Sequence, residues 1–270
     1  MTKLGKQLRL SRIFDTKTNT AIICPMDHAI TEYVPELADP RRIMRSVVEA
    51  GVNAFLIRRG LAKFASVEYA GKAGLILRLN ASTGLRGKFT ENAYVSSVEE
   101  ALRLGADAVA VCVFVGSERE IIDLEKLGSI SDACDEWGMP LLAEMVPIGG
   151  KNAVPYDGPY TVDELRIAVR TGAEAGADFI KAYYTGDPES YKEVIKYSTV
   201  PIVVAGGPRE KNVRAILERV KGAMDAGAVG ISMGRKLWGY KDPAALTRAL
   251  VKIIREKASV EEAMKELGAI

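Results

Sequence analysis

Hydrophobic residues occur along this chain in short runs, and these runs alternate with longer segments whose hydrophobic positions follow a helical period. Short apolar runs are typical of strands buried on both faces, and their alternation with amphipathic helices predicts a parallel sheet. No stretch rich in serine and proline interrupts the alternation. We therefore expect a single domain that covers residues 1–270.

A repeat appears when the predicted helix ends are aligned, because each helix is stopped by a glycine and followed at once by an apolar strand. The glycines are Gly51, Gly105, Gly176 and Gly227. Four further strand candidates alternate with these, at residues 21–27, 74–80, 140–146 and 201–207. Eight strands that alternate with helices predict an α/β fold, a closed (β/α)8 TIM barrel.

The same repeat predicts which side chains point into the barrel. The fifth residue after each glycine is Leu56, Ala110, Lys181 and Ser232 in turn. Layers inside a barrel are made by alternate strands, so these four are expected to face inward. Long loops are expected after residues 27, 80 and 146, at the end of the barrel where active sites are built.

Lys181 lies in the middle of the apolar and aromatic run of residues 177–187. An ammonium is costly to bury, so a lysine there either reaches solvent or loses its proton more readily than a free lysine. An amine that loses its proton readily is a nucleophile and forms Schiff bases with carbonyl substrates. A lysine at a strand end that reaches water is the structural alternative.

Glycines end the last two predicted strands, at Gly206 and Gly207 before Pro208 and at Gly234 before Arg235. Glycine lets backbone N–H groups approach an anion, and in barrels this pair of loops is a frequent phosphate site. Arg235 adds a charged donor. Each motif alone is also common in turns and helix entries, but their occurrence at both positions favours a phosphate site.

Carboxylates provide the other candidate chemistry. Asp27 closes the first strand and is expected to hold the ammonium of Lys181, orient substrate hydroxyls or move protons, although helix capping is the alternative. Glu144 stands in an apolar strand, and a buried carboxylate needs a partner such as Lys181 or a substrate hydroxyl. His28 is interpreted as a hydrogen-bonded neighbour of the site. Arg59, and likewise Arg78, end strands, where arginines commonly serve ion pairs.

Charge and composition argue against several kinds of partner, site and location. Lysine and arginine total 37 against 35 acidic residues, so the net charge of +2 argues against nucleic acid as a partner. The 3 cysteines show no metal-type spacing, and a single histidine makes a histidine-based metal site hard to build. No signal-peptide core or membrane-spanning run is found, so we expect a cytoplasmic protein.

Several short motifs are spread over nearly the whole chain. They are Leu10–Phe14, Pro25–His28, Arg59-Gly60, Val115–Glu118, Gly138–Pro140, Ile180-Lys181, Tyr184–Asp187, Val203–Pro208 and Met233–Arg235. Together they resemble the archaeal-type class I aldolase family, which includes fructose-bisphosphate aldolase, 2-amino-3,7-dideoxy-D-threo-hept-6-ulosonate synthase and autoinducer-2 phosphate thiolase.

The resemblance implies a TIM barrel, a Schiff base on Lys181, Asp27 as an active-site carboxylate, and phosphate binding by the glycine loops and Arg235. It also implies a homo-oligomer, a pentamer or decamer, and a phosphorylated small-molecule substrate. No cofactor and no metal is expected.

One position departs from the family pattern. In the bisphosphate aldolases and the heptulosonate synthase the fifth strand ends in Tyr-Pro-Arg-Gly, and the tyrosine is the acid/base. This chain has Val146-Pro147-Ile148-Gly149 there. A valine cannot move a proton, so Tyr183 and Glu144 are the candidates to replace the tyrosine.

The sequence thus predicts a metal-independent class I aldolase that acts on a phosphorylated ketose, such as fructose 1,6-bisphosphate, or on a related keto sugar phosphate, with the heptulosonate synthase reaction as one possibility. Three alternatives stay open. They are acyl transfer like that of the thiolase, a catalytically silent phosphosugar-binding barrel, and an isomerase of the phosphate-barrel type.

Overall fold

The computed structural model describes residues 3–87, 90–148, 160–207 and 210–268. Two predicted positions, Gly149 after the fifth strand and Pro208 of the Gly-Gly-Pro motif, lie outside the described residues.

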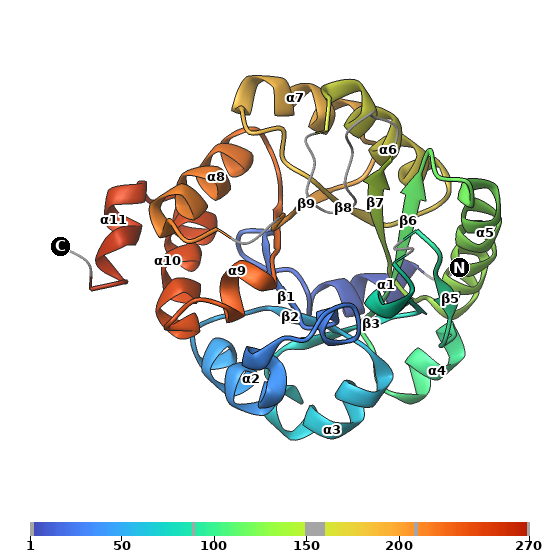
Figure 1. The fold of residues 1–270 in the computed structure, drawn as a ribbon, viewed down its shortest axis with the longest axis horizontal. Coiled ribbons are helices and arrows are strands. Elements are labelled where there is room, and N and C mark those ends of the chain that lie inside the picture. The colour runs from blue at the N-terminus through green and yellow to red at the C-terminus, as the bar shows by residue number, and fades with distance from the viewer. Residues whose placement is uncertain (1–2, 88–89, 149–159, 208–209, 269–270) are drawn as a thin grey trace.

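Eight parallel strands close into a barrel, which confirms the predicted fold class. Around the barrel they follow their order in the chain, and the last pairs with the first. Figure 1 shows the barrel end-on, with the helices in a ring outside it. The strands are β1 (Ala21–Pro25), β2 (Ala54–Ile57), β3 (Gly74–Arg78), β6 (Ala108–Val115), β7 (Leu141–Pro147), β8 (Phe179–Ala182), β9 (Ile202–Ala205) and β10 (Gly230–Ser232).

Helices connect each strand to the next, as predicted. Most begin at a polar residue whose side chain accepts a hydrogen bond from the helix backbone, as Thr161 and Asp187 do. The helices are α1 (Lys3–Leu10), α2 (Pro40–Glu49), α3 (Arg59–Tyr69), α4 (Val98–Arg103), α5 (Glu120–Trp137), α6 (Val162–Glu174), α7 (Pro188–Tyr197), α8 (Val213–Asp225), α9 (Arg235–Trp238), α10 (Pro243–Glu256) and α11 (Val260–Lys265).

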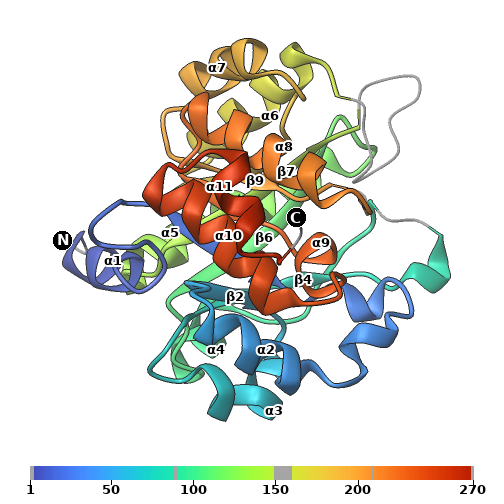
Figure 2. The ribbon, with the colours of Figure 1, turned by 90° about the vertical axis from the view of Figure 1, so that its left-hand side faces the viewer.

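The loops after β1 and β3 carry small elements that the sequence did not predict. These are the 3-10 helices η1 (His28–Ile30), η2 (Pro35–Ala38) and η3 (Gly84–Arg86), and a hairpin of β4 (Asn80–Ala81) with β5 (Ala93–Tyr94). Figure 2 shows these loops at the end of the barrel opposite to α1. At the α1 end, Ile13 is fully buried in the barrel interior, and the rings of Phe14 and Phe179 lie 5.4 Å apart.

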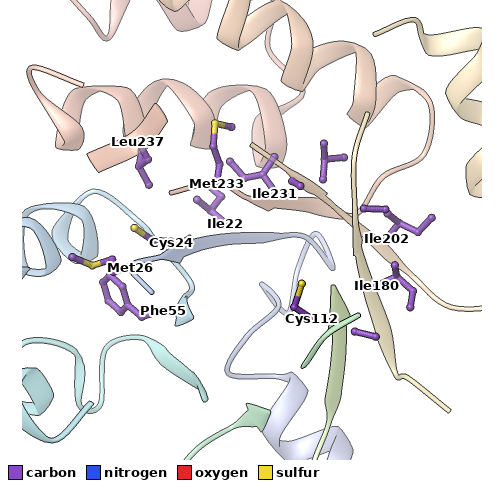
Figure 3. Close-up of a cluster of buried hydrophobic side chains, with 14 of the residues drawn as sticks. Ile22, Cys24, Met26, Phe55, Cys112, Ile180, Ile202, Ile231, Met233 and Leu237 are labelled. Carbon is purple, nitrogen blue, oxygen red and sulfur yellow. The ribbon is translucent and has the colours of Figure 1, made fainter. Parts of the chain in front are cut away.

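The strand register decides which side chains enter the barrel, because residues paired across parallel strands point to the same side. Ile23 pairs with Ala54 and Ser232, and around the ring the same face carries Ile76, Ala110, Leu142, Phe179 and Val203. Leu56, Ala110, Lys181 and Ser232 all share this face, as predicted. Outward-facing residues, such as Ile22, Ile180 and Ile231 in Figure 3, join the larger apolar cluster under the helices.

The repeat at the helix ends has a second function that the sequence did not reveal. Asn53, Asp107 and Asp178, two residues after their glycines, each accept a hydrogen bond from a backbone N–H in the first two residues of the neighbouring strand. The corresponding residue in the fourth copy is Val229. The carboxylate of Asp178 also pairs with Lys6 of α1 at 2.9 Å, so it joins α1 to the base of the barrel.

The three cysteines, Cys24, Cys112 and Cys134, are free and buried. In the part of the chain that the structure describes, no helix has the length and apolar character that crossing a bilayer requires.

Asp178→Ala tests this strand-capping role. The buried N–H of Leu141 would lose its acceptor, so we expect the free energy of unfolding in urea to fall by about 1–3 kcal/mol. The control is Asp225→Ala, which removes only an exposed ion pair with Lys221 and should cost less than about 1 kcal/mol. An unfolding midpoint that is unchanged in Asp178→Ala would contradict this role.

Candidate active site

A cavity opens at the carboxyl ends of the strands. It contains every predicted site residue except Asp27 and Arg59. Its lining residues are Pro25, His28, Glu144, Lys181, Tyr183, Ala205, Gly206, Gly207, Ser232, Gly234 and Arg235.

Lys181 of β8 points into this cavity and is 5% exposed. Its Nζ atom lies 2.6 Å from Oε1 of Glu144 on the neighbouring strand β7. The two residues are register partners, so the parallel pairing of β7 with β8 brings their side chains together on the inward face. The prediction that Lys181 lies inside the barrel and that Glu144 has it as a partner is confirmed.

Glu144 is also buried and makes a second ion pair, with Nη2 of Arg78 on β3. Burial by itself would raise the pKa of the carboxyl, but the charges of Lys181 and Arg78 outweigh it and lower the pKa to about 2. Glu144 is therefore ionised at neutral pH in the resting site, with a cation on each side.

Asp27 lies just after β1, and its carboxylate pairs with Arg78 and not, as expected, with the ammonium of Lys181. Its carboxylate lies 3.0 Å from Nε of Arg78, 3.4 Å from Nδ1 of His28 and 3.8 Å from Nη1 of Arg58. Burial raises the pKa of Asp27, but Arg78, His28 and Arg58 together hold it well below its ordinary value. Glu144, and not Asp27, holds the ammonium of Lys181.

Arg78 is the charged residue of the site whose position the sequence interpretation undervalued. It was interpreted as an arginine that ends a strand and serves an ion pair, but it is 4% exposed and joins the two acidic residues of the site. A signal existed, because Arg78 follows Ile76 on the inward face of β3. Ser232 is a second residue of the site that was undervalued: its hydroxyl lines the cavity and has no hydrogen-bond partner among the described residues.

Of two further predicted site residues, Tyr183 lies at the cavity and Arg59 does not. Tyr183 lines the cavity, with its ring 4.9 Å from that of Tyr160. Burial, and then the charge of Glu144, raise the pKa of Tyr183 well above its ordinary value, so its hydroxyl keeps its proton at neutral pH. Arg59 is the first residue of α3, and its side chain is exposed and does not line the cavity.

The two glycine loops meet at the cavity as predicted. A side chain at Gly206 would come within 2.7 Å of Met233, and one at Gly234 within 2.4 Å of the carbonyl oxygen of Pro25. Gly207 adopts a positive φ of 70°. Nη2 of Arg235 lies 3.2 Å from the carbonyl oxygen of Gly207, which joins the loops after β9 and β10.

A buried lysine inside a barrel, beside glycine loops at its carboxyl end, is an arrangement that Schiff-base chemistry can use. A family model described as "DeoC/LacD family aldolase" matches residues 21–239. The chain belongs to this aldolase family.

Relatives of this aldolase agree with the resemblance found in the sequence. It is 37% identical over 265 residues to 2-amino-3,7-dideoxy-D-threo-hept-6-ulosonate synthase 1 of Archaeoglobus fulgidus, with 98% of this chain and 96% of the relative covered. The chain is also 34% identical over 268 residues to 2-amino-4,5-dihydroxy-6-oxo-7-(phosphonooxy)heptanoate synthase of Streptomyces griseus, and the match covers 98% of this chain and 96% of that relative.

A solved structure of a Schiff-base-forming fructose-1,6-bisphosphate aldolase superimposes with a TM-score of 0.82 at 33% identity. The match covers 92% of this chain and 99% of that structure's chain.

Arg78→Met tests the electrostatic arrangement. Removing the guanidinium leaves Asp27 and Glu144 buried without it, so we expect a loss of about 3–5 kcal/mol in the free energy of unfolding near pH 7. Carboxylates with a lowered pKa stabilise the fold above their ordinary pKa, and this contribution is lost as the pH falls from 4.5 towards about 2. Without Arg78 the carboxylates take up protons at higher pH, so the penalty should shrink near pH ~4.

The control for this variant is Arg103→Met. It removes an exposed ion pair with Glu100, so the free energy of unfolding should fall by less than about 1 kcal/mol. Urea denaturation at the two pH values measures both variants. A loss in Arg78→Met that is equal at both would contradict the assigned cause.

Proposed function

We propose that this aldolase makes or breaks a carbon–carbon bond in a phosphorylated ketose or related keto sugar phosphate, through a Schiff base on Lys181. The observation that carries the proposal is the buried Nζ of Lys181, 2.6 Å from the carboxylate of Glu144 and in one cavity with Gly206, Gly207 and Gly234. The names of the relatives support the substrate class, since one is a synthase of a 6-oxo, 7-phosphonooxy acid and another a bisphosphate aldolase.

The first step requires a neutral amine. Glu144 accepts a proton from the ammonium of Lys181, and the freed nitrogen lone pair attacks the substrate carbonyl carbon. The carbonyl π-electrons move to oxygen, which takes the proton from Glu144. Glu144 then removes one proton from the attached nitrogen and gives it to the hydroxyl, which leaves as water while the nitrogen lone pair forms the protonated imine.

The protonated imine then draws electrons from the bond that breaks. In the cleavage direction, a base removes the proton of the substrate hydroxyl, an aldehyde leaves, and the electron pair of the broken bond forms an enamine. Synthesis is the reverse of these steps. We assign this proton transfer to Glu144, because its carboxylate reaches the reacting nitrogen. It would act as the acid/base in place of the family tyrosine, whose position is occupied by Val146 in this chain. Tyr183 keeps its proton, so its part is to donate a hydrogen bond.

The substrate phosphate is assigned to the two glycine loops. Gly206, Gly207 and Gly234 line the cavity and carry no side chain that would keep an anion from their backbone N–H groups, and Arg235 supplies positive charge. The unpartnered hydroxyl of Ser232 is available to a substrate oxygen, and His28 contributes at the edge of the cavity. A homo-oligomer remains part of the proposal through the family resemblance.

The lysine is tested by borohydride trapping. Lys181→Met should add no mass after treatment with borohydride and fructose 1,6-bisphosphate or dihydroxyacetone phosphate, whereas the parent protein should gain the mass of the reduced adduct in intact-protein mass spectrometry. Lys236→Met, a change at the other buried lysine of the described residues, is the matched control and should be trapped. Trapping should also survive EDTA. An adduct that forms on Lys181→Met would remove Lys181 from this role.

The proton carrier is tested separately. Glu144→Gln keeps the shape of the side chain but cannot carry the proton, so turnover should fall by about 10²-fold or more. Tyr183→Phe removes only a hydrogen-bond donor, and its loss should be smaller. Steady-state kinetics with the best trapped substrate measures both, and turnover of Glu144→Gln at the parental rate would exclude the carboxylate.

A further inference from the structure

Ser232 of β10 lies at the same height inside the barrel as Lys181 of β8. One strand, β9, separates the two residues. Val203 of β9 pairs with Lys181, and Ala205, the next inward residue of β9, pairs with Ser232. Strands of a barrel tilt against its axis, so a step of two residues over two strands keeps both side chains in one layer. Ser232 is therefore the neighbour of Lys181 on the side away from Glu144.

The hydroxyl of Ser232 is buried and unsatisfied. The residue is 1% exposed, and its Oγ atom has no hydrogen-bond partner among the described residues. The other buried serine and threonine hydroxyls in this part of the chain do have partners; they belong to Thr20, Ser131 and Thr247. An unpaired buried hydroxyl costs free energy that an alanine would avoid, so the serine needs another explanation.

The catalytic cavity is where this hydroxyl can find an acceptor. Towards the α1 end of the barrel, the interior is filled with apolar side chains that include Ile23, Phe179 and Val203. Towards the mouth, Ser232 lines the same cavity as Lys181. A substrate in that cavity is therefore the acceptor that the fold leaves for the hydroxyl.

The position of Ser232 along its strand indicates which substrate oxygen it meets. Two residues further towards the mouth is Gly234, which is assigned to the substrate phosphate, so Ser232 lies between that loop and the layer of the amine. In dihydroxyacetone phosphate a single carbon joins the carbonyl carbon to the phosphate ester oxygen. A phosphate at Gly234 and a carbonyl carbon at Nζ of Lys181 therefore bring the carbonyl oxygen to Ser232.

We propose that Ser232 is a catalytic residue, whose Oγ–H donates a hydrogen bond to the carbonyl oxygen that Lys181 attacks. The inference rests on the proposed function. The nitrogen lone pair forms the new C–N bond, the π-electrons move to oxygen, and Glu144 gives that oxygen its proton, whereas Ser232 keeps its own. A donor aimed at an oxygen that gains negative charge stabilises the transition state more than the substrate.

Ser232→Ala tests this role through the rate of imine formation. Protein and dihydroxyacetone phosphate are mixed, borohydride is added after increasing times, and the trapped fraction is measured from the intact mass. At saturating substrate the trapped fraction should rise at least about tenfold more slowly in Ser232→Ala than in the parent. The substrate concentration that gives half of the maximal rate should change little, because the hydrogen bond strengthens in the transition state.

Stability separates this role from a structural one. Ser232→Ala removes an unpaired buried hydroxyl, so its unfolding midpoint in urea should equal or exceed the parental one. The control is Ser131→Ala, at a buried serine outside the cavity whose hydroxyl donates to the carbonyl oxygen of Gly176 at 3.2 Å. This control should be trapped at the parental rate.

Inorganic phosphate, used as a competitor, separates the carbonyl oxygen from the phosphate group. Ser232→Ala should be inhibited at the same phosphate concentration as the parent, whereas Arg235→Met should require more. The inference is overturned if Ser232→Ala forms the adduct at the parental rate, if it unfolds at a lower urea concentration, or if it loses phosphate inhibition as Arg235→Met does. The proposed function stands in each of these cases. A parent protein that is never trapped would overturn both.

Discussion

An ammonium inside a barrel of apolar strands is stable only beside a carboxylate, and this requirement organises the site. Lys181 and Glu144 form the pair, 2.6 Å apart and both almost fully buried. Two cations keep Glu144 ionised there, and Arg78 provides the second. Arg78 in turn is shared with Asp27, so charges of alternating sign cross the mouth of the barrel from β8 to β1.

The barrel provides the positions for this network through its register. Lys181 and Glu144 are paired residues of adjacent parallel strands, and Arg78 lies on the same inward face. The amide and carboxylate side chains of Asn53, Asp107 and Asp178 hold the opposite ends of the strands. A change of register by one residue would turn Lys181 outward, and both the ion pairs and the chemistry would be lost.

Much of this followed from sequence, because glycine stops and apolar runs have direct physical meanings. The repeat of helix-stop glycines predicted the strands and their inward face, and Lys181 and Glu144 were evident as charges within apolar strands. Partners across the barrel were not evident. Asp27 was expected beside Lys181. Its carboxylate instead pairs with Arg78, whose strand lies between those of Asp27 and Lys181 around the barrel.

Local geometry explains the other differences. Arg59 was expected near the substrate, but α3 begins at this residue and its side chain is exposed. Lys236 follows Arg235 in a four-residue helix, which is too short for a periodic pattern that would reveal a buried face. The β4–β5 hairpin is equally short, with two residues in each strand.

The central claim, that Lys181 is the nucleophile at a site whose phosphate group lies at the glycine loops, is tested most directly by a crystal structure of the borohydride-reduced protein with dihydroxyacetone phosphate. The account predicts continuous density from Nζ of Lys181 to the former carbonyl carbon, and a phosphate against Gly206, Gly207, Gly234 and Arg235. Density joined to a different lysine, or a phosphate bound away from these loops, would contradict it.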